Sequence, residues 1–232
     1  MKPDKKRTSS AASKPASRPA AKNGAKGTAK SAPNASAEEP RPLTQAMRDD
    51  IARACEVMRK GGVILYPTDT VWGIGCDASN EEAVRRVFEI KRRADSKAML
   101  VLVDSASRMS RYVREVPAVA WDLIELADTP LTIIYDGARN LAPALVAEDG
   151  SVGIRVTSEP FSKELCYRFQ KAIVSTSANV SGEPTARTYA EISQEIRDAV
   201  DYVCTSRHRE KGVAKPSSII KLSVNGQFRI IR

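Results

Sequence analysis

The apolar positions of the chain first become periodic after residue 43. Apolar residues then recur at helical spacing, which predicts a helix that Thr44 caps and that ends at Gly61-Gly62. A run of four apolar residues at 63–66 follows the glycines and predicts a buried strand. The buried face of the helix should carry Met47, Ile51, Ala54, Cys55 and Met58.

Short apolar runs separated by helical patterns continue to the end of the chain. Ser79 and Glu82 have the spacing of a capping box and predict a second helix start. Thr188 and Glu191 repeat that spacing and predict another. A further helix is expected at about 161–171, and strands are expected over 99–103, 131–135, 152–156, 172–175, 218–222 and 228–231.

The order of these elements indicates the fold class. Strands alternate with helices, but Asn225-Gly226 predicts an antiparallel hairpin between the last two strands. The sequence contains no internal repeat. We therefore predict an α+β (mixed α/β) fold in which helices flank a twisted mixed sheet.

The first 42 residues differ from the rest in composition and charge. They contain ten Lys or Arg and three Asp or Glu, a net charge of +7 out of +9 for the whole chain. Alanine, lysine, proline and serine dominate, so the segment cannot bury enough apolar surface to offset its ordering entropy. We predict a disordered tail over 1–42 and one domain over 43–232. A solubilising tail and an electrostatic arm for RNA or DNA both remain open.

Composition excludes several classes of protein. No apolar run approaches the roughly 18 residues of a membrane span, and the first residues do not have the pattern of a secretory signal. We therefore expect a cytoplasmic protein without a membrane partner. The four cysteines have no CxxC spacing, which argues against a zinc or redox centre. The single histidine, His208, lies in a polar stretch and should be an exposed loop residue.

Two polar segments near the middle of the chain suggest a ligand site. The strand at 63–66 runs directly into Pro-Thr-Asp-Thr and then into Gly73 and Gly75, which alone predict a plain turn. Hydroxyls and free backbone N–H groups there suit a carboxylate or phosphate. The segment 91–97 holds Lys91, Arg93 and Lys97, which either complement the helix dipole or form a polyphosphate clamp.

Two later segments have similar chemistry. Residues 175–182 read Ser-Thr-Ser-Ala-Asn-Val-Ser-Gly and directly follow a predicted strand. Open α/β sheets place ligands at the carboxyl ends of strands, so this loop is predicted to bind a small polar ligand. Two further hydroxyls, those of Ser217 and Ser218, lie at the start of the next-to-last strand and do not by themselves indicate a site. The sequence has neither a GxxxxGK[ST] phosphate loop nor a GxGxxG dinucleotide motif.

Taken in order, these segments resemble the YrdC/Sua5/YciO family from about residue 44 onward. The family's Tyr-Pro-Thr-acid-Thr motif with its glycine-rich continuation matches residues 66–75, and its Lys-x-Arg motif matches Lys91 and Arg93. Its Val-Gly-Ile-Arg strand matches 152–155. Its Ser-x-Asn motif matches Ser177 and Asn179, and its late Pro-Ser-Thr-Ile element matches 216–219 with Ser218 in place of threonine.

The resemblance implies a strongly twisted mixed sheet around a deep, basic cleft. It implies an L-threonylcarbamoyladenylate synthase, a nucleotidyltransferase that uses L-threonine, bicarbonate and ATP with Mg²⁺. Its product would pass to a tRNA threonylcarbamoyl-transfer complex acting at adenosine 37 of tRNA, so tRNA or double-stranded RNA is an expected partner. A YciO-like paralogue and a non-catalytic double-stranded RNA-binding module are the alternatives.

The resemblance also assigns roles to individual residues. Threonine-binding roles fall on Thr68, Arg155, Ser175 and Ser217. Nucleotide-binding roles fall on Lys91, Arg93, Lys97, Ser151, Ser177, Thr185 and Arg232. Catalytic roles fall on Lys91, Arg93, Ser177 and Asn179, and no metal ligand is assigned.

The sequence departs from the family pattern at a few positions. Ala94 and Ala98 replace prolines, and Leu102 stands where Sua5 members tend to have a threonine-contacting histidine. The usual Pro-Gly-Pro-Leu-Thr reads Asp-Thr-Pro-Leu-Thr at 128–132. We expect no second domain after the synthase region, which would correspond to the short, YrdC-like type of the family.

Overall fold

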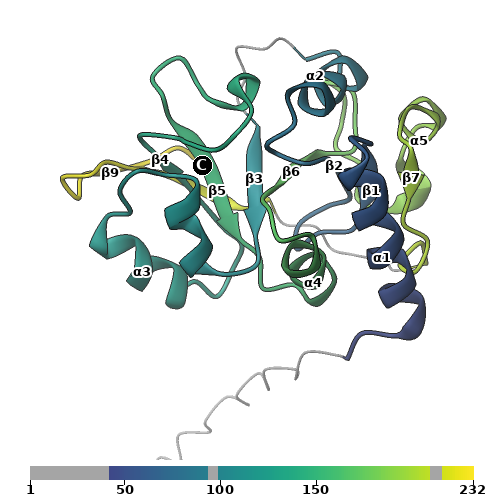
Figure 1. The fold of residues 1–232 in the computed structure, drawn as a ribbon, viewed down its shortest axis with the longest axis horizontal. Helices are drawn as coiled ribbons and strands as arrows, with labels where there is room; N and C mark the ends of the chain where they lie inside the picture. The colour runs from purple at the N-terminus through teal and green to yellow at the C-terminus, as the bar shows by residue number, and fades with distance from the viewer. Residues whose placement is uncertain (1–41, 94–98, 210–215) are drawn as a thin grey trace, which may run out of the picture. The chain divides into compact units, whose positions relative to one another are not determined.

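A computed structural model describes residues 42–93, 99–209 and 216–232. The tail predicted at 1–42 lies outside the described residues except for its last position, so its disorder stays a prediction. The described strands form one nine-stranded sheet in the order β7-β1-β2-β6-β3-β5-β4-β8-β9 (Figure 1). The strands are β1 (Ile64–Tyr66), β2 (Gly73–Gly75), β3 (Leu100–Val103), β4 (Leu131–Tyr135), β5 (Val152–Val156), β6 (Ile173–Ser177), β7 (Tyr202–Val203), β8 (Ser218–Leu222) and β9 (Phe228–Ile230).

The sheet is mixed, as predicted. The pairs β1–β7, β3–β5 and β4–β8 are parallel, and the other neighbours are antiparallel. The closing hairpin of β8 and β9 is present, and Gly226 has a φ of +82° that suits its tight turn. Helices α1 and α4 lie side by side, and α4 also contacts β3 (Figure 1). The α-helices are α1 (Gln45–Arg59), α2 (Glu81–Ile90), α3 (Ala118–Glu125), α4 (Pro160–Phe169) and α5 (Gln194–Ala199).

Helix α1 begins as the sequence predicts. The hydroxyl of Thr44 accepts a hydrogen bond from the Met47 N–H at 3.2 Å, and the predicted apolar face is buried except for Met47, which is partly buried. Asp50 on the same helix is also buried, which the apolar pattern does not predict. Its carboxylate accepts hydrogen bonds from the Tyr202 hydroxyl and from the backbone N–H groups of Thr205 and Ser206 at 2.6–3.1 Å. These bonds lower the pKa of Asp50 although burial acts to raise it, and they tie the segment after β7 to α1.

The first predicted capping box is wrong by one residue. Asn80, not Ser79, caps α2, because its side-chain oxygen accepts from the Ala83 N–H at 3.1 Å. Ser79 instead bonds through its N–H and its hydroxyl to one carboxylate oxygen of Asp77, at 2.8 and 2.6 Å. A side chain that closes a turn with a nearby carboxylate is not available to cap the helix.

The second predicted capping box does not start an α-helix. Thr188 precedes a single 3₁₀ turn over Tyr189–Glu191, and the Glu191 carboxylate accepts from the Arg187 N–H at 2.8 Å. Helix α5 starts later, at Gln194, and Ser193 caps it. The other described 3₁₀ turns span Ala106–Arg111 and Pro143–Leu145.

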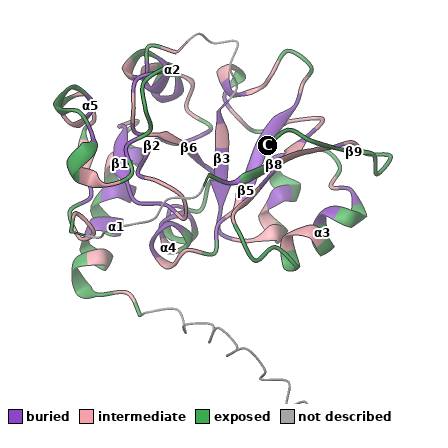
Figure 2. Cartoon of the chain, turned by 180° about the vertical axis from the view of Figure 1, so that it is seen from behind, coloured by how far each residue is buried: buried purple, intermediate pink, exposed green. Residues whose placement is uncertain are grey.

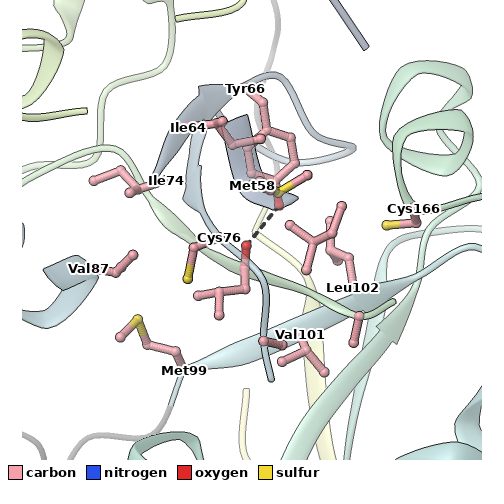
Figure 3. Packing of buried hydrophobic residues seen from close by; sticks show 14 of the residues in the cluster. Met58, Ile64, Tyr66, Ile74, Cys76, Val87, Met99, Val101, Leu102 and Cys166 are labelled. Carbon is pink, nitrogen blue, oxygen red and sulfur yellow. Dashed lines mark hydrogen bonds between the residues drawn. The ribbon is translucent and has the colours of Figure 1, made fainter. Parts of the chain in front are cut away.

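The glycine pair predicted to form a plain turn is a strand, β2. A side chain at Gly75 would place its Cβ 2.6 Å from the Tyr66 ring and 2.6 Å from the Val174 carbonyl oxygen. Glycine is therefore required because two neighbouring strands approach closely here. Figure 3 shows the same region, where the buried Tyr66 hydroxyl donates to the Val174 carbonyl at 3.1 Å.

The buried residues form one hydrophobic cluster along the sheet and the helices that contact it (Figure 2). All four cysteines belong to it as free thiols: Cys55, Cys76, Cys166 and Cys204. Burial raises the pKa of each of these thiols, so none is an activated thiolate. Within the described ranges, no helix is long and apolar enough to cross a membrane.

Candidate active site

One cavity of about 590 Å³ opens at the sheet, a size typical of a ligand pocket. Hydroxyl groups and arginines dominate its polar lining, and no carboxylate lines it among the residues that the structure describes. The hydroxyl-bearing lining residues are Thr68, Thr70, Thr132, Ser151, Ser175, Thr176, Ser177, Thr185 and Ser217. The arginines are Arg93, Arg155, Arg187 and Arg232. Val71, Met99, Leu100, Ile134, Ala147, Val152 and Ile219 add an apolar portion.

Strand register brings residues from distant parts of the chain to this cavity. Leu100 on β3 pairs with Ser175 on β6 and with Gly153 on β5. Thr132 on β4 pairs with Arg155 on β5. Because strands that are neighbours in the sheet are far apart in sequence, the cavity combines segments that the sequence shows only separately.

Arg155 is the most deeply buried cation of the cavity wall, with 3% of its side chain exposed. Its Nη2 lies 3.0 Å from Oδ1 of Asp69, which is also buried, and 3.5 Å from the Thr70 hydroxyl. Burial raises the pKa of Asp69, and the charge of Arg155 opposes that rise. The Nε of Arg155 has no hydrogen-bond partner among the described residues. A buried guanidinium with an unused N–H at a cavity wall is suited to receive an anionic ligand group.

The loop after β1 presents Thr68 to the same cavity. The Thr68 hydroxyl donates to the Val71 carbonyl at 2.6 Å and accepts from the Thr70 N–H at 3.1 Å. The two threonine hydroxyls also lie 3.1 Å apart. These bonds hold a short row of hydroxyls in fixed positions, as a site for a small polar ligand requires.

Lys91 is placed differently from what the phosphate-clamp prediction assumes. It does not line the cavity, and only 2% of it is exposed. Its ammonium donates to the carbonyl oxygens of Ser177 at 2.6 Å and Asn179 at 2.7 Å, so it lies against the backbone of the polar loop. Burial, with the nearby charge of Arg93, lowers the pKa of Lys91 to about 8.

Asn179 also supports the loop. Its side-chain amide donates to the carbonyls of Val180 at 2.9 Å and Glu183 at 2.8 Å, and it does not line the cavity. Its side-chain oxygen is buried without a hydrogen-bond partner among the described residues. The neighbouring Ser177 does line the cavity. At this loop, Ser177 therefore lines the cavity, whereas Lys91 and Asn179 form the hydrogen bonds that hold the loop backbone.

Ser151 lies at the start of β5 and is oriented by a carboxylate outside the cavity. Its N–H and its hydroxyl both donate to Oδ1 of Asp149, at 3.0 and 2.6 Å. The other oxygen of Asp149 accepts from the ammonium of Lys221 at 2.6 Å. Hydrogen bonds from Lys221 and Ser151 lower the pKa of Asp149 to about 2.

Ser217 and Arg232 also line the cavity. The Ser217 hydroxyl lies 3.1 Å from that of Thr132, and both are buried. The Nε of Arg232 donates to the Ser217 carbonyl at 3.2 Å, and the Arg232 carbonyl accepts from the Ile219 N–H at 2.9 Å. The last residue of the chain is thus bound to the start of β8.

The structure gathers most of the predicted site residues around this single cavity. Those that line it are Thr68, Arg93, Ser151, Arg155, Ser175, Ser177, Thr185, Ser217 and Arg232. Lys91 and Asn179 lie behind the lining, and Lys97 lies outside the described residues. Their chemical roles stay predictions.

Sequence reasoning missed several lining residues. Arg187 is two residues from the predicted Thr185, and the pattern Thr-x-Arg could have indicated a second cation there. Thr132 lies inside an apolar strand, where no local signal distinguishes a cavity-facing hydroxyl from a buried one. Leu102 is buried next to Arg155 in register and does not line the cavity, so it supplies no polar contact.

His208 is not the exposed loop histidine that the sequence predicts. Its ring stacks on Tyr189 with centroids 3.5 Å apart and an interplanar angle of 7°. Trp72 lies 5.5 Å from the same imidazole, and burial lowers the pKa of His208. Its neighbours in the sequence are polar, so the sequence did not indicate the aromatic cluster that His208 forms with Trp72 and Tyr189.

Comparison with known proteins is consistent with this arrangement. The Sua5/YciO/YrdC family model, described as "Telomere recombination", matches residues 56–232. The chain therefore belongs to the Sua5/YciO/YrdC family. A threonylcarbamoyl-AMP synthase of Pseudomonas paraeruginosa is 37% identical over 177 residues, which cover 75% of this chain and 92% of that protein. The enzyme of the same name from Pseudoalteromonas translucida is 33% identical over 180 residues, covering 76% and 95%.

Solved structures show the same fold. E. coli YciO superimposes with a TM-score of 0.71 and 27% identity, covering 83% of this chain and 91% of that one. P. abyssi Sua5 complexed with L-threonine superimposes with a TM-score of 0.70 and 22% identity, covering 78% and 52%. The second likeness concerns the fold alone, and it agrees with the predicted twisted mixed sheet.

Proposed function

We propose that the protein is an L-threonylcarbamoyladenylate synthase that makes threonylcarbamoyl-AMP and pyrophosphate for the modification of tRNA. The observation that carries this proposal is the cavity itself, which combines a buried arginine, a row of hydroxyls and three further arginines without a lining carboxylate. The curated relatives that match most of this domain bear the name of that activity.

The Arg155 end of the cavity fits threonine. The substrate carboxylate would bind the Arg155 guanidinium, whose Nε is unused and whose Nη2 lies 3.0 Å from Asp69. Thr68 and Ser175 lie in the same wall and would hydrogen-bond the substrate hydroxyl and amine.

The remaining arginines fit a nucleotide triphosphate. Arg93, Arg187 and Arg232 would neutralise phosphate oxygens, and Ser151 and Ser177 would bind the nucleotide or the intermediate. Among the described residues no group of three or more metal-ligand side chains is found, so Mg²⁺ would arrive with ATP and be held by its phosphates. Bound there, it would supply charge neutralisation on the phosphates.

The reaction needs no covalent enzyme intermediate. The threonine nitrogen would attack the carbon of bicarbonate, and loss of one water would leave a carbamate. A carbamate oxygen would then bond to the α-phosphorus, and the bond to the β,γ-pyrophosphate would break. The protein would contribute orientation and charge stabilisation, which are the main terms in phosphoryl and nucleotidyl transfer.

The test is pyrophosphate release from ATP, measured with and without threonine and bicarbonate. We expect release that requires both, and we expect Arg155→Met to reduce kcat/KM for threonine by about 100-fold, as loss of one charged contact does. Arg108→Met is the matched control, since Arg108 is a largely buried arginine paired with Asp104 outside the cavity. Pyrophosphate release at the same rate with and without threonine would refute the proposal. RNA binding without any pyrophosphate release would favour the non-catalytic alternative.

A further inference from the structure

A second depression lies at the other end of β6. Its volume is about 510 Å³, and its lining comes from the segment between α4 and β6, from the end of the 3₁₀ turn at 110–112, and from the loops that carry Ser79 and Arg139. The catalytic cavity takes residues from the carboxyl end of β6, whereas this depression takes Lys171 and Ala172, which precede the strand. Along β6 the two linings come closest at Ala172 and Ser175, which are three residues or roughly 10 Å apart at about 3.3 Å per residue.

Three cations line this depression, and no carboxylate does so among the described residues: Arg111, Arg139 and Lys171. All three are exposed. Arg111 has no ion-pair partner within the described part of the chain. Lys171 is held by Asp77 at 2.6 Å, so that one carboxylate behind the lining balances part of the charge and leaves an excess of positive charge.

The cations are held by polar contacts. The Arg139 guanidinium donates to the Ser110 carbonyl, and the Asn140 amide donates to the Arg111 carbonyl at 2.7 Å. The loop that carries Arg139 is therefore fixed to the 3₁₀ turn that carries Arg111. Because the Arg139 guanidinium is already positioned, a ligand would not have to order it on binding.

A buried phenol completes the lining. Tyr112 is only 6% exposed, and its oxygen accepts from the Ala172 N–H at 2.7 Å. No hydrogen bond from the Tyr112 hydroxyl to a described residue is present, and Tyr112 is one of the lining residues. The hydroxyl can therefore donate to a ligand oxygen or to water.

We propose that this depression is a second anion site that binds a phosphate group. Arg111 and Arg139 would contact its oxygens, the Tyr112 hydroxyl would donate one further hydrogen bond, and Lys171 would add charge. Planar guanidinium groups suit tetrahedral oxyanions because they donate two parallel N–H bonds. The phosphate could come from an RNA backbone or from a free phosphate or nucleotide, and the site does not depend on the proposed catalytic function.

The test compares the full chain with an Arg111→Ala/Arg139→Ala variant. The control is Arg53→Ala/Arg85→Ala, which removes the same charge from exposed helix positions outside both depressions. The probes are an RNA duplex, followed by anisotropy between 50 and 200 mM salt, and inorganic phosphate, followed by calorimetry. Pyrophosphate release is measured in parallel and should be unchanged in both variants.

Two contacts to RNA phosphates should contribute about 1.5 to the slope of log affinity against log salt, and the first variant should lose that amount. Loss of the slope in this variant alone supports the proposal with RNA as the source. Loss of inorganic phosphate binding with an unchanged RNA slope supports it with a free phosphate as the source. Equal behaviour of both variants with both probes would overturn the proposal, whatever the pyrophosphate assay shows.

Discussion

Replacing Lys91 by methionine tests how the polar loop is held. The Lys91 ammonium is almost fully buried and donates to the carbonyls of Ser177 and Asn179. Methionine keeps a long, flexible, apolar side chain but removes the charge and the donors. The variant should fold, because the removed group is one of many contacts of the loop, but it should differ from the wild type in its response to pH.

The size of the effect follows from the pKa of Lys91, which burial and Arg93 lower from 10.5 to about 8. Between these two values the unfolded chain binds a proton that the folded protein does not. The free energy of unfolding of the wild type therefore rises with pH across this window. At about 1.36 kcal/mol per pKa unit, the rise is about 3 kcal/mol. The variant has no such group. The free energy of unfolding of the wild type minus that of the variant should therefore increase by that amount from pH 7 to 10.5.

Urea unfolding at intervals of one pH unit, followed by tryptophan fluorescence, measures this difference. Lys163→Met serves as the control because Lys163 is an exposed lysine on α4. Its curve should parallel that of the wild type. Parallel curves for Lys91→Met as well would refute the reasoning, since they would mean that the Lys91 ammonium is not buried in solution.

The same variant separates two roles for Lys91 in activity. If Lys91 positions the loop, its loss should raise KM for both threonine and ATP and lower kcat by about 10- to 100-fold, because a small misplacement of binding groups is costly. If Lys91 contacts the ATP phosphates, as the family resemblance implies, the threonine KM should hold while the ATP KM rises. Initial rates with each substrate varied in turn distinguish the two.

Three further predictions concern the fold and the tail. Gly75→Ala should lower the free energy of unfolding by about 1–3 kcal/mol in urea titrations, since the added Cβ would meet Tyr66 at 2.6 Å. Gly226→Ala is the comparison, because open space surrounds Gly226 and its substitution should lower the free energy of unfolding only through the positive φ. The lowered pKa of Asp50 makes its stabilisation depend on ionisation, so the wild type should lose stability as the pH falls below about 4. Asp50→Asn should lose less stability over the same range, and an acid unfolding curve parallel to that of the wild type would contradict this. Deleting residues 1–42 should leave pyrophosphate release nearly unchanged and flatten the salt dependence of RNA binding, and an equal slope would leave a solubilising tail.

The sequence predicted the elements whose signals are local. The strands at 131–135 and 152–156 have the predicted bounds, because each is a short, mainly apolar segment flanked by polar residues or a proline. Strand β2 could not be predicted, since two of its three residues are glycines with no side chain to make a pattern. Helix α3 has no capping signal in the sequence either. Pro117 occupies its N-cap position, and a proline side chain cannot accept a capping hydrogen bond.

The site was predicted where polar residues follow strands and missed where its geometry depends on distant packing. Ser175 and Ser177 end an apolar run, so their exposure to a ligand could be expected. The Lys91 ammonium points to the backbone carbonyl of Ser177 and not into the cavity. That contact joins residues 86 positions apart, so the sequence around Lys91 could not indicate it. Thr132 has a similar ambiguity, since its face of the sheet is fixed by pairing with β5 and β8.

The four cysteines give the protein an internal set of reporters. A thiol reacts with an alkylating reagent only as the exposed thiolate, and each of these thiols is buried with a raised pKa. Cys55 and Cys166 lie on α1 and α4, Cys76 directly follows β2, and Cys204 directly follows β7. The rate of alkylation at each position, read by mass spectrometry, therefore measures how often that part of the fold opens. Equal rates at all four would mark one cooperative unit, and faster labelling at Cys204 would identify the segment beyond β7 as the first to detach.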